Sequence, residues 1–117
     1  MAVTVTNIQD GPRTLVVWLY IAADNADAVV VDASALAGAP TRLSLIEAQW
    51  ALTGAAATLE WDQTTDAGLL EMTVGNGFIL PSEGVKNVAG AGTTGDVMLT
   101  NAAELTSGSV YLKFNKT

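Results

Sequence analysis

Three glutamates spaced along the apolar segments of this sequence are its first candidates for chemistry: Glu47, Glu60 and Glu71. Most glycosidases hydrolyse their substrate with two carboxylates that flank the scissile bond. Each of these glutamates has apolar neighbours, however, and a solvated glutamate is ordinary at the outward position of a strand. A sequence does not give the distance between two carboxylates, so a hydrolase is the least favoured of the functions that we consider.

Histidine and cysteine are both absent from the 117 residues. Their absence removes the commonest general base, the thiolate nucleophile and the commonest ligands of transition metals. It also excludes every Ser-His-Asp or Cys-His arrangement and any disulfide bond. We therefore predict a protein that is not an enzyme and that has no catalytic residue, no metal site and no cofactor.

Carboxylates cluster again in the polar segment around Asp62 and Asp66, close behind Glu60. Oxygen ligands of this kind bind hard cations such as Ca²⁺, but an EF-hand loop needs more acidic residues and a glycine at fixed positions. Asp and Thr side chains in short polar loops commonly hydrogen-bond to their own backbone. An acidic turn is the favoured interpretation of this segment.

A glycine-rich segment at residues 90–95 satisfies the G-x-G-x-x-G pattern of dinucleotide-binding sites. In such sites a strand precedes the glycines and a helix follows them, so that the phosphates meet the helix N-terminus. Here a predicted strand follows the glycines, and the residues before them are irregular. We therefore interpret this segment as a loop and predict no nucleotide.

Tryptophan and tyrosine side chains offer a different kind of chemistry, because sugars stack on indole and phenol rings. The sequence contains five of them: Trp18, Tyr20, Trp50, Trp61 and Tyr111. Trp50 and Trp61 fall on the inward phase of their segments, which predicts a place in the core or in a subunit contact. For Trp18 and Tyr20 our first expectation is a contact with another chain, and a glycan-binding platform is the alternative.

Residues 14–22 (Thr-Leu-Val-Val-Trp-Leu-Tyr-Ile-Ala) form the element that must position Trp18 and Tyr20. They contain no glycine, proline or charge, and β-branched and aromatic residues favour a strand. Alternation gives two sets of side chains: Leu15, Val17, Leu19 and Ile21 on one face, and Val16, Trp18 and Tyr20 on the other. Both faces are apolar, so we predict a central strand with one face in the core and the other covered by a loop or a partner chain.

Eight further segments show strand patterns, with turn residues between them. They are residues 2–8, 28–32, 42–52, 56–61, 69–74, 78–80, 97–100 and 109–115. The glycines of Gly75-Asn76-Gly77 predict a tight turn, because they tolerate a positive φ. About eight or nine short strands predict an all-β fold, an antiparallel β-sandwich or jelly-roll. The length indicates a single domain over residues 1–117, with a possible N-terminal arm.

Twelve acidic residues against five basic ones give the sequence a net charge of −7. Phosphate backbones and anionic membranes repel such a chain, and its basic residues are scattered. The first residues lack the features of a signal peptide, and no apolar run reaches the length of a membrane span. We therefore expect a soluble protein made in a cytoplasm, with no nucleic-acid or membrane partner. Its few charges favour a surface that packs against other chains.

Five strings spread over most of the chain carry a family resemblance. They are Val-Thr-Asn-Ile-Gln-Asp-Gly-Pro-Arg at residues 5–13, Leu-Glu-Trp-Asp-Gln-Thr-Thr-Asp at 59–66, Gly-Asn-Gly-Phe at 75–78, Gly-Thr-Thr-Gly-Asp-Val-Met-Leu-Thr at 92–100 and Ser-Gly-Ser-Val-Tyr-Leu-Lys-Phe at 107–114. Together they are similar to small virion proteins of tailed bacteriophages. Members with an assigned role look like head decoration, or cement, proteins of β-sandwich or jelly-roll fold. Neither catalytic residues nor defined contact residues come with the resemblance.

The resemblance implies a structural virion protein on the capsid exterior, made in the host cytoplasm. It would bind the outer surface of a phage head, bridge subunits of the major capsid protein and stabilise the shell. We expect a homo-oligomer, with a trimer favoured. The residues that we expect at an interface are Asp10, Gly11, Pro12, Arg13, Trp18 and Tyr20. Two alternatives stay open: a carbohydrate-binding β-sandwich that adheres to the host surface, and a tail or neck component.

Overall fold

The computed structural model describes residues 3–22, 25–38, 40, 42–63, 67–81, 84–86, 95–102 and 104–116. Ten strands and a short 3₁₀ helix lie in these residues. They are β1 (Val3–Asp10), β2 (Thr14–Ile21), β3 (Asn25–Val31), η1 (Ala33–Ala35), β4 (Leu43–Thr53), β5 (Ala57–Trp61), β6 (Ala67–Met72), β7 (Gly75–Ile79), β8 (Val85–Lys86), β9 (Val97–Asn101) and β10 (Ser107–Lys116). The all-β prediction is confirmed, and the two-residue β8 is the strand that no sequence pattern indicated.

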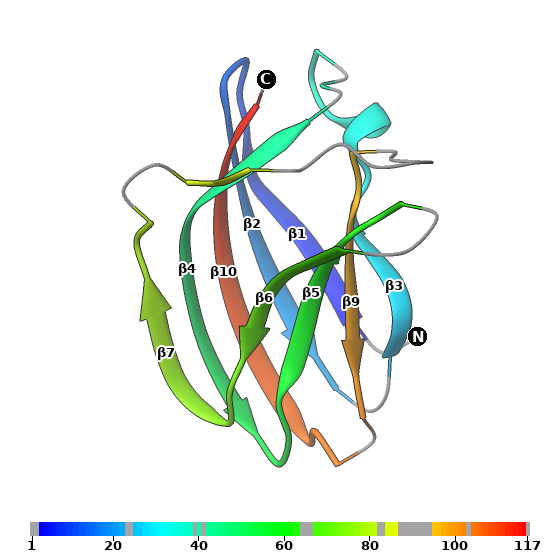
Figure 1. Ribbon diagram of the computed structural model, residues 1–117, viewed down its shortest axis with the longest axis vertical. Coiled ribbons are helices and arrows are strands. Elements are labelled where there is room, and N and C mark those ends of the chain that lie inside the picture. The colour runs from blue at the N-terminus through cyan, green and yellow to red at the C-terminus, as the bar shows by residue number, and fades with distance from the viewer. Residues whose placement is uncertain are drawn as a thin grey trace.

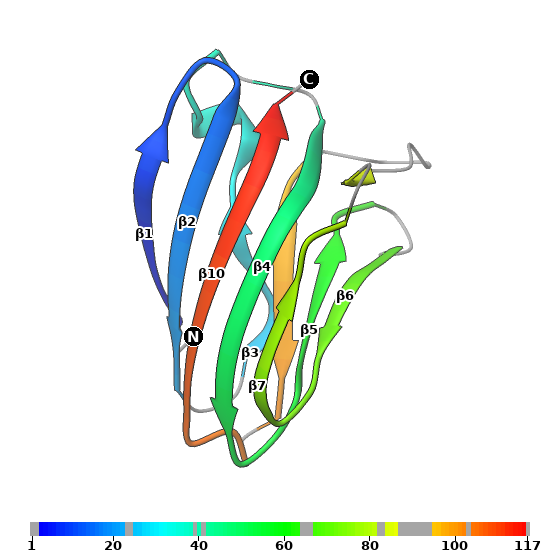
Figure 2. The same cartoon turned by 90° about the vertical axis from the view of Figure 1, so that its left-hand side faces the viewer.

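The strands form two antiparallel sheets that pack face to face (Figure 1). Sheet A has the order β1-β2-β10-β4-β7, with β8 paired to β4, and sheet B has the order β3-β9-β5-β6. Figure 2 shows the strands of sheet A side by side, with sheet B behind them. The sets β2-β10-β4-β7 and β3-β9-β5-β6 have the strand order of a jelly roll, to which β1 adds an outer strand. The fold is therefore a β-sandwich of the jelly-roll kind.

The core lies between the two sheets, and β2 supplies its longest unbroken row of side chains. As predicted, β2 is central, because it lies between β1 and β10. One set of its side chains is fully buried in the core: Leu15, Val17, Leu19 and Ile21. Trp61 of sheet B meets Phe114 of sheet A edge to face, with ring centroids 6.4 Å apart and an interplanar angle of 65°. This contact packs the two sheets against each other.

The predicted turn at residues 75–77 is wrong, because these residues open β7. The chain turns at residues 73–74, and Gly75 follows with φ +96°. Gly77 is needed for a different reason. A Cβ atom there would lie 2.0 Å from Cζ2 of the Trp50 indole. Glycine at this position therefore makes room for the ring that crosses β7.

Trp50 and Trp61 both pack against the core, which is the first of the two places that their inward phase predicted. Trp61 is only 2% exposed, whereas Trp50 is half-buried because its ring reaches over the edge strand β7. The Nε1 atom of Trp50 is buried and has no hydrogen-bond partner among the described residues. The Trp50 ring is therefore held by packing against the core and over Gly77.

Candidate functional site

The outer face of sheet A carries four aromatic side chains, and we call this surface the aromatic face: Trp18, Tyr20, Phe78 and Tyr111. Trp18 is 44% exposed, Tyr20 48% and Phe78 55%. The surface arises because β2 is apolar at both of its phases, so one set of side chains fills the core and the other points outward. No described loop covers Trp18 or Tyr20, so cover by another chain remains our expectation.

One row of side chains crosses four strands of this face. Trp18 on β2 lies opposite Tyr111 on β10, and Tyr111 lies opposite Gln49 on β4. Gln49 in turn lies opposite Phe78 on β7. Directly opposed side chains in an antiparallel sheet have Cβ atoms about 5 Å apart. The row is therefore a continuous strip of ring and amide surface.

A hollow of about 370 Å³ lies along this row. Its lining consists of Trp18, Gln49, Trp50, Ala51, Asn76, Gly77, Ser109, Val110 and Tyr111. Nε1 of Trp18 donates a hydrogen bond to Oγ of Ser109 at 2.9 Å, which fixes the orientation of the indole ring. The lining offers rings, amides and hydroxyls and contains no charged side chain. A partner that binds here meets a surface whose largest ring is already oriented.

Charge differs between the outer faces of the two sheets. On sheet A, Glu47 and Lys113 lie opposite each other across β4 and β10, so their charges offset. On sheet B, Glu60 and Glu71 lie on neighbouring strands. Oε1 of Glu60 accepts a hydrogen bond from Oγ1 of Thr100 at 3.2 Å. The four strands of sheet B contain no lysine or arginine, so its outer face is acidic.

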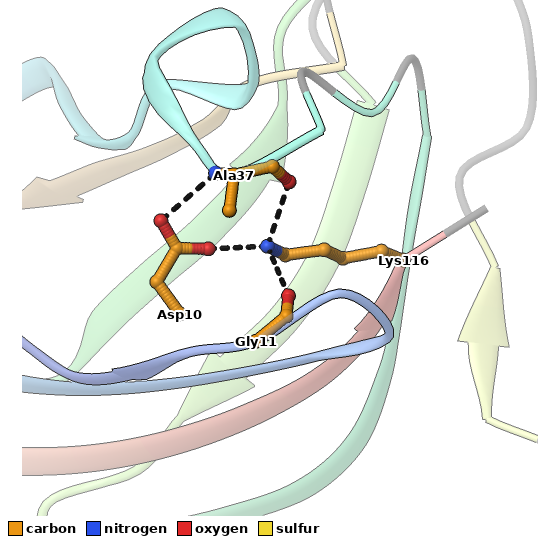
Figure 3. A network of polar contacts seen from close by, with 4 residues as sticks. All are labelled: Asp10, Gly11, Ala37 and Lys116. Carbon is orange, nitrogen blue, oxygen red and sulfur yellow. Dashed lines mark hydrogen bonds and ion pairs between the residues drawn. The ribbon is translucent and has the colours of Figure 1, made fainter.

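A network of polar contacts joins three segments at one end of the sandwich, and we call it the Lys116 clamp (Figure 3). Nζ of Lys116 forms an ion pair with Oδ1 of Asp10. It also donates hydrogen bonds to the carbonyl oxygens of Gly11, at 2.6 Å, and Ala37, at 3.0 Å. The backbone N–H of Ala37 donates to Oδ2 of Asp10 at 2.9 Å. The clamp therefore joins the end of β10, the β1–β2 turn and the loop after η1.

The clamp also changes the acidity of Asp10. The hydrogen bond from Lys116, with that from the Ala37 N–H second, lowers the pKa of Asp10 below its ordinary value of 3.8. The Lys116 side chain is only 3% exposed, so its ammonium group depends on these partners. The folded protein therefore favours the ionised form of Asp10.

The six residues predicted at an interface fall into two groups. Asp10 and Gly11 belong to the Lys116 clamp, and Pro12 and Arg13 are exposed in the adjoining turn. Trp18 and Tyr20 lie on the aromatic face. The contact of these six residues with another chain stays a prediction.

The candidate carboxylates do not gather at one place. Glu47 projects from β4 of sheet A, whereas Glu60 and Glu71 lie on sheet B. Among the residues that the structure describes, no group of three or more His, Cys, Asp or Glu is placed to hold a metal ion. Asp66 and residues 90–94 of the glycine-rich segment lie outside the described residues.

Several residues of the aromatic face and of the Lys116 clamp were not predicted from the sequence. Phe78 and Gln49 join the aromatic face through the register of β4 with β7, which depends on strand order. Lys116 meets Asp10, which is 106 positions away in the sequence. A lysine at the end of a strand carries no signal for such a distant partner. Tyr111, by contrast, alternates with the buried residues Val110, Leu112 and Phe114, and the sequence pattern predicts that its side chain points outward.

Comparison with known proteins gives no family. The sequence matches no family model and no curated protein. The structure of CoII HppE in complex with Tris buffer is similar over 97% of this chain and 52% of its own, at 10% identity and a TM-score of 0.40. Hydroxypropylphosphonic acid epoxidase from S. wedmorenis is similar over 89% and 44%, at 10% identity and a TM-score of 0.37.

A cupin superfamily protein from Desulfitobacterium hafniense is similar over 97% of this chain and 76% of its own, at 7% identity and a TM-score of 0.37. This chain spans about half the length of the CoII HppE chain and of the hydroxypropylphosphonic acid epoxidase chain. Likenesses with TM-scores this low carry no argument about function. Separately, no helix in the described part of the chain has the length and apolar character needed to cross a membrane.

Proposed function

We propose that this protein is a structural component of a bacteriophage virion. In this role it is a decoration or cement protein that binds the exterior of the head and bridges subunits of the major capsid protein. The resemblance of the sequence to small virion proteins of tailed bacteriophages supports the assignment to a virion. The observation that carries the proposal is the contrast between an aromatic outer face on sheet A, where the charges of Glu47 and Lys113 offset, and an acidic outer face on sheet B.

The aromatic face is the proposed docking surface. Interface cores are enriched in aromatic residues and depleted of charge, and tryptophan and tyrosine supply much of the binding energy. Trp18, Tyr20 and Tyr111 lie together on this face, and the hollow beside them is free of charge. The acidic sheet B then faces solvent, where its charge keeps decorated particles apart. Many copies on one shell add their modest interfaces, and no catalytic residue is required.

The proposal can be tested with phage heads that lack this protein. Adding the purified protein back is expected to produce co-sedimentation with the heads and to raise the temperature at which they release DNA. Trp18→Ala is expected to weaken both effects, because it removes a ring from the docking surface. Glu71→Gln, an exposed change on sheet B, is the matched control and is expected to behave as the wild type.

Two results would overturn the proposal. One is wild-type protein that never co-sediments with heads and leaves their DNA-release temperature unchanged. The other is a cryo-EM map of the virion that places the chain only in the tail or neck, which is the alternative role within the same class.

The hollow on sheet A favours a second candidate, a carbohydrate-binding module for host-surface glycans. Its lining combines oriented rings with the amides of Gln49 and Asn76 and the hydroxyl of Ser109, the groups that bind neutral sugars. A glycan array is expected to show binding that Trp18→Ala abolishes and Glu71→Gln preserves. An array without signal removes this candidate and leaves the virion proposal unaffected.

A further inference from the structure

Strand β1 forms an edge of sheet A with one side unpaired in the described structure. It pairs with β2 in unbroken register from Val3 to Asn7. Figure 2 shows β1 at the side of the sheet with no strand beyond it. Alternate residues of an antiparallel strand direct their N–H and C=O groups away from the paired neighbour. The outer side of β1 therefore presents backbone donors and acceptors to solvent, and residues 4–10 are all exposed.

The segment from Val3 to Asn7 lacks the devices that usually protect an edge. Natural edges carry lysine, proline, an inward charge or a bulge, or they are very short. This segment reads Val-Thr-Val-Thr-Asn, and the bulge of β1 comes only between Asn7 and Gln9. The other edges are less suited to pairing. β3 has two irregularities, β6 has a bulge, and β7 begins with Gly-Asn-Gly.

Apolar surface adjoins this open edge. A hollow of about 210 Å³ lies between β1 and β3, and most of its lining is apolar: Val5, Asn7, Val29, Val30, Val31, Asp32, Ala35 and Leu36. Val5 is 38% exposed although it lies on the core-facing side of sheet A, and Val29 is 43% exposed. A further strand on β1 would carry its own inward side chains beside this hollow and remove both valines from water.

We propose that this strand is the β1 of a second copy of the chain, paired antiparallel about a two-fold axis at Val5. In this register Val5 lies opposite Val5 of the partner subunit, and Thr4 lies opposite Thr6 of the partner subunit. Opposed β-branched residues and opposed threonines stabilise a strand pair, and no charge faces a like charge. The sequence of the edge is thus complementary to itself, as an interface with two-fold symmetry requires.

The pairing deepens the proposed function, and its consequence for shells rests on that function. An axis perpendicular to the sheet joins the two copies of sheet A into one continuous sheet and keeps both aromatic faces on the same side. Two docking surfaces then act as one bivalent platform, so each dimer binds a shell more tightly than a monomer. Two-fold pairing gives a dimer, whereas the sequence favoured a trimer.

The molar mass of the protein in solution tests the pairing in the absence of phage heads. Analytical ultracentrifugation of the wild type is expected to show a dimer that dissociates on dilution. The double variant Thr4→Lys/Thr6→Lys opposes lysines across the axis and is expected to raise the dissociation constant about tenfold or more. Thr4→Glu/Thr6→Glu is expected to do the same, and mixing the two variants is expected to restore the dimer. Thr53→Lys/Thr73→Lys, at two exposed positions outside β1, is the matched control.

Hydrogen exchange provides a measurement on unmodified protein. Outward amides of residues 3–7 are expected to exchange slowly at high concentration and quickly after dilution. A wild type that is monomeric or trimeric, a lysine variant that keeps its dimer, or exchange that ignores concentration would each overturn the pairing. None of these results decides whether the protein binds heads, which the add-back experiment measures separately.

Discussion

The outer faces of sheets A and B differ although both sheets are built by the same alternation of side chains. Sheet A presents Trp18, Tyr20 and Phe78 to solvent, whereas sheet B presents Glu60 and Glu71. Burial of the inward set is sufficient to form each sheet, so folding does not require aromatic side chains on the outside. Large exposed apolar patches usually mark a surface of interaction. The difference therefore supports the proposal that sheet A is the docking face.

Removing two rings from the aromatic face should have the largest effect. Trp18→Ala/Tyr20→Ala is expected to lower the affinity for phage heads about a hundredfold or more, because aromatic residues at an interface centre carry much of the binding energy. Co-sedimentation over a concentration series measures it. The control Glu60→Gln/Glu71→Gln makes two changes on sheet B and is expected to bind as the wild type. Equal losses for both double variants would erase the distinction between the faces.

Glycine-to-alanine changes compare the edge strands of the two sheets. Gly77→Ala on β7 should lower the free energy of unfolding by about 1–3 kcal/mol, since the new methyl group overlaps the Trp50 ring. Gly68→Ala on β6 meets no atom within 4 Å and is expected to be neutral or slightly stabilising. Urea denaturation measures both. A Gly77→Ala variant as stable as the wild type would show that Trp50 does not need this opening.

Giving sheet A an acidic charge should make it resemble sheet B. Ala51→Glu places a carboxylate beside the uncharged hollow and is expected to weaken head binding about tenfold, because a charge in an interface core loses its hydration. Ala102→Glu makes the same substitution at an exposed position after β9 and serves as the control. Unchanged binding by Ala51→Glu would place the docking surface elsewhere.

The smallest effect concerns the Lys116 clamp, which stabilises the fold without belonging to either outer face. The lowered pKa of Asp10 means that its contribution to stability is present above pH 3.8 and is lost as the pH falls through the folded value. Asp10→Asn is therefore expected to be less stable than the wild type at pH 7, with the difference shrinking below pH 3.8. Thermal denaturation across this range measures it. A stability difference that persists at low pH would contradict an electrostatic role for Asp10.

Local alternation in the sequence predicted much of the fold. The buried set Leu15, Val17, Leu19 and Ile21 followed directly from it, and so did the outward place of Trp18 and Tyr20. What could not be predicted depends on strand order. The aromatic row needs the register of β10 with both β2 and β4, and the clamp needs residues from the two ends of the chain. Gly77 also depends on strand order: the local pattern indicated a turn, whereas the glycine makes room for the ring of Trp50 on the neighbouring strand.

The positions of the first and last strands have a mechanical consequence. β1 and β10 flank β2, and Val3 lies level with Gly108 while Asp10 lies level with Phe114. The start of β1 and the end of β10 therefore point to opposite ends of the sheet. A pull on the two termini slides β1 and β10 along β2 and loads all their ladder bonds together, instead of peeling them apart one by one. A domain pulled in this way resists stretching most strongly along its own strands.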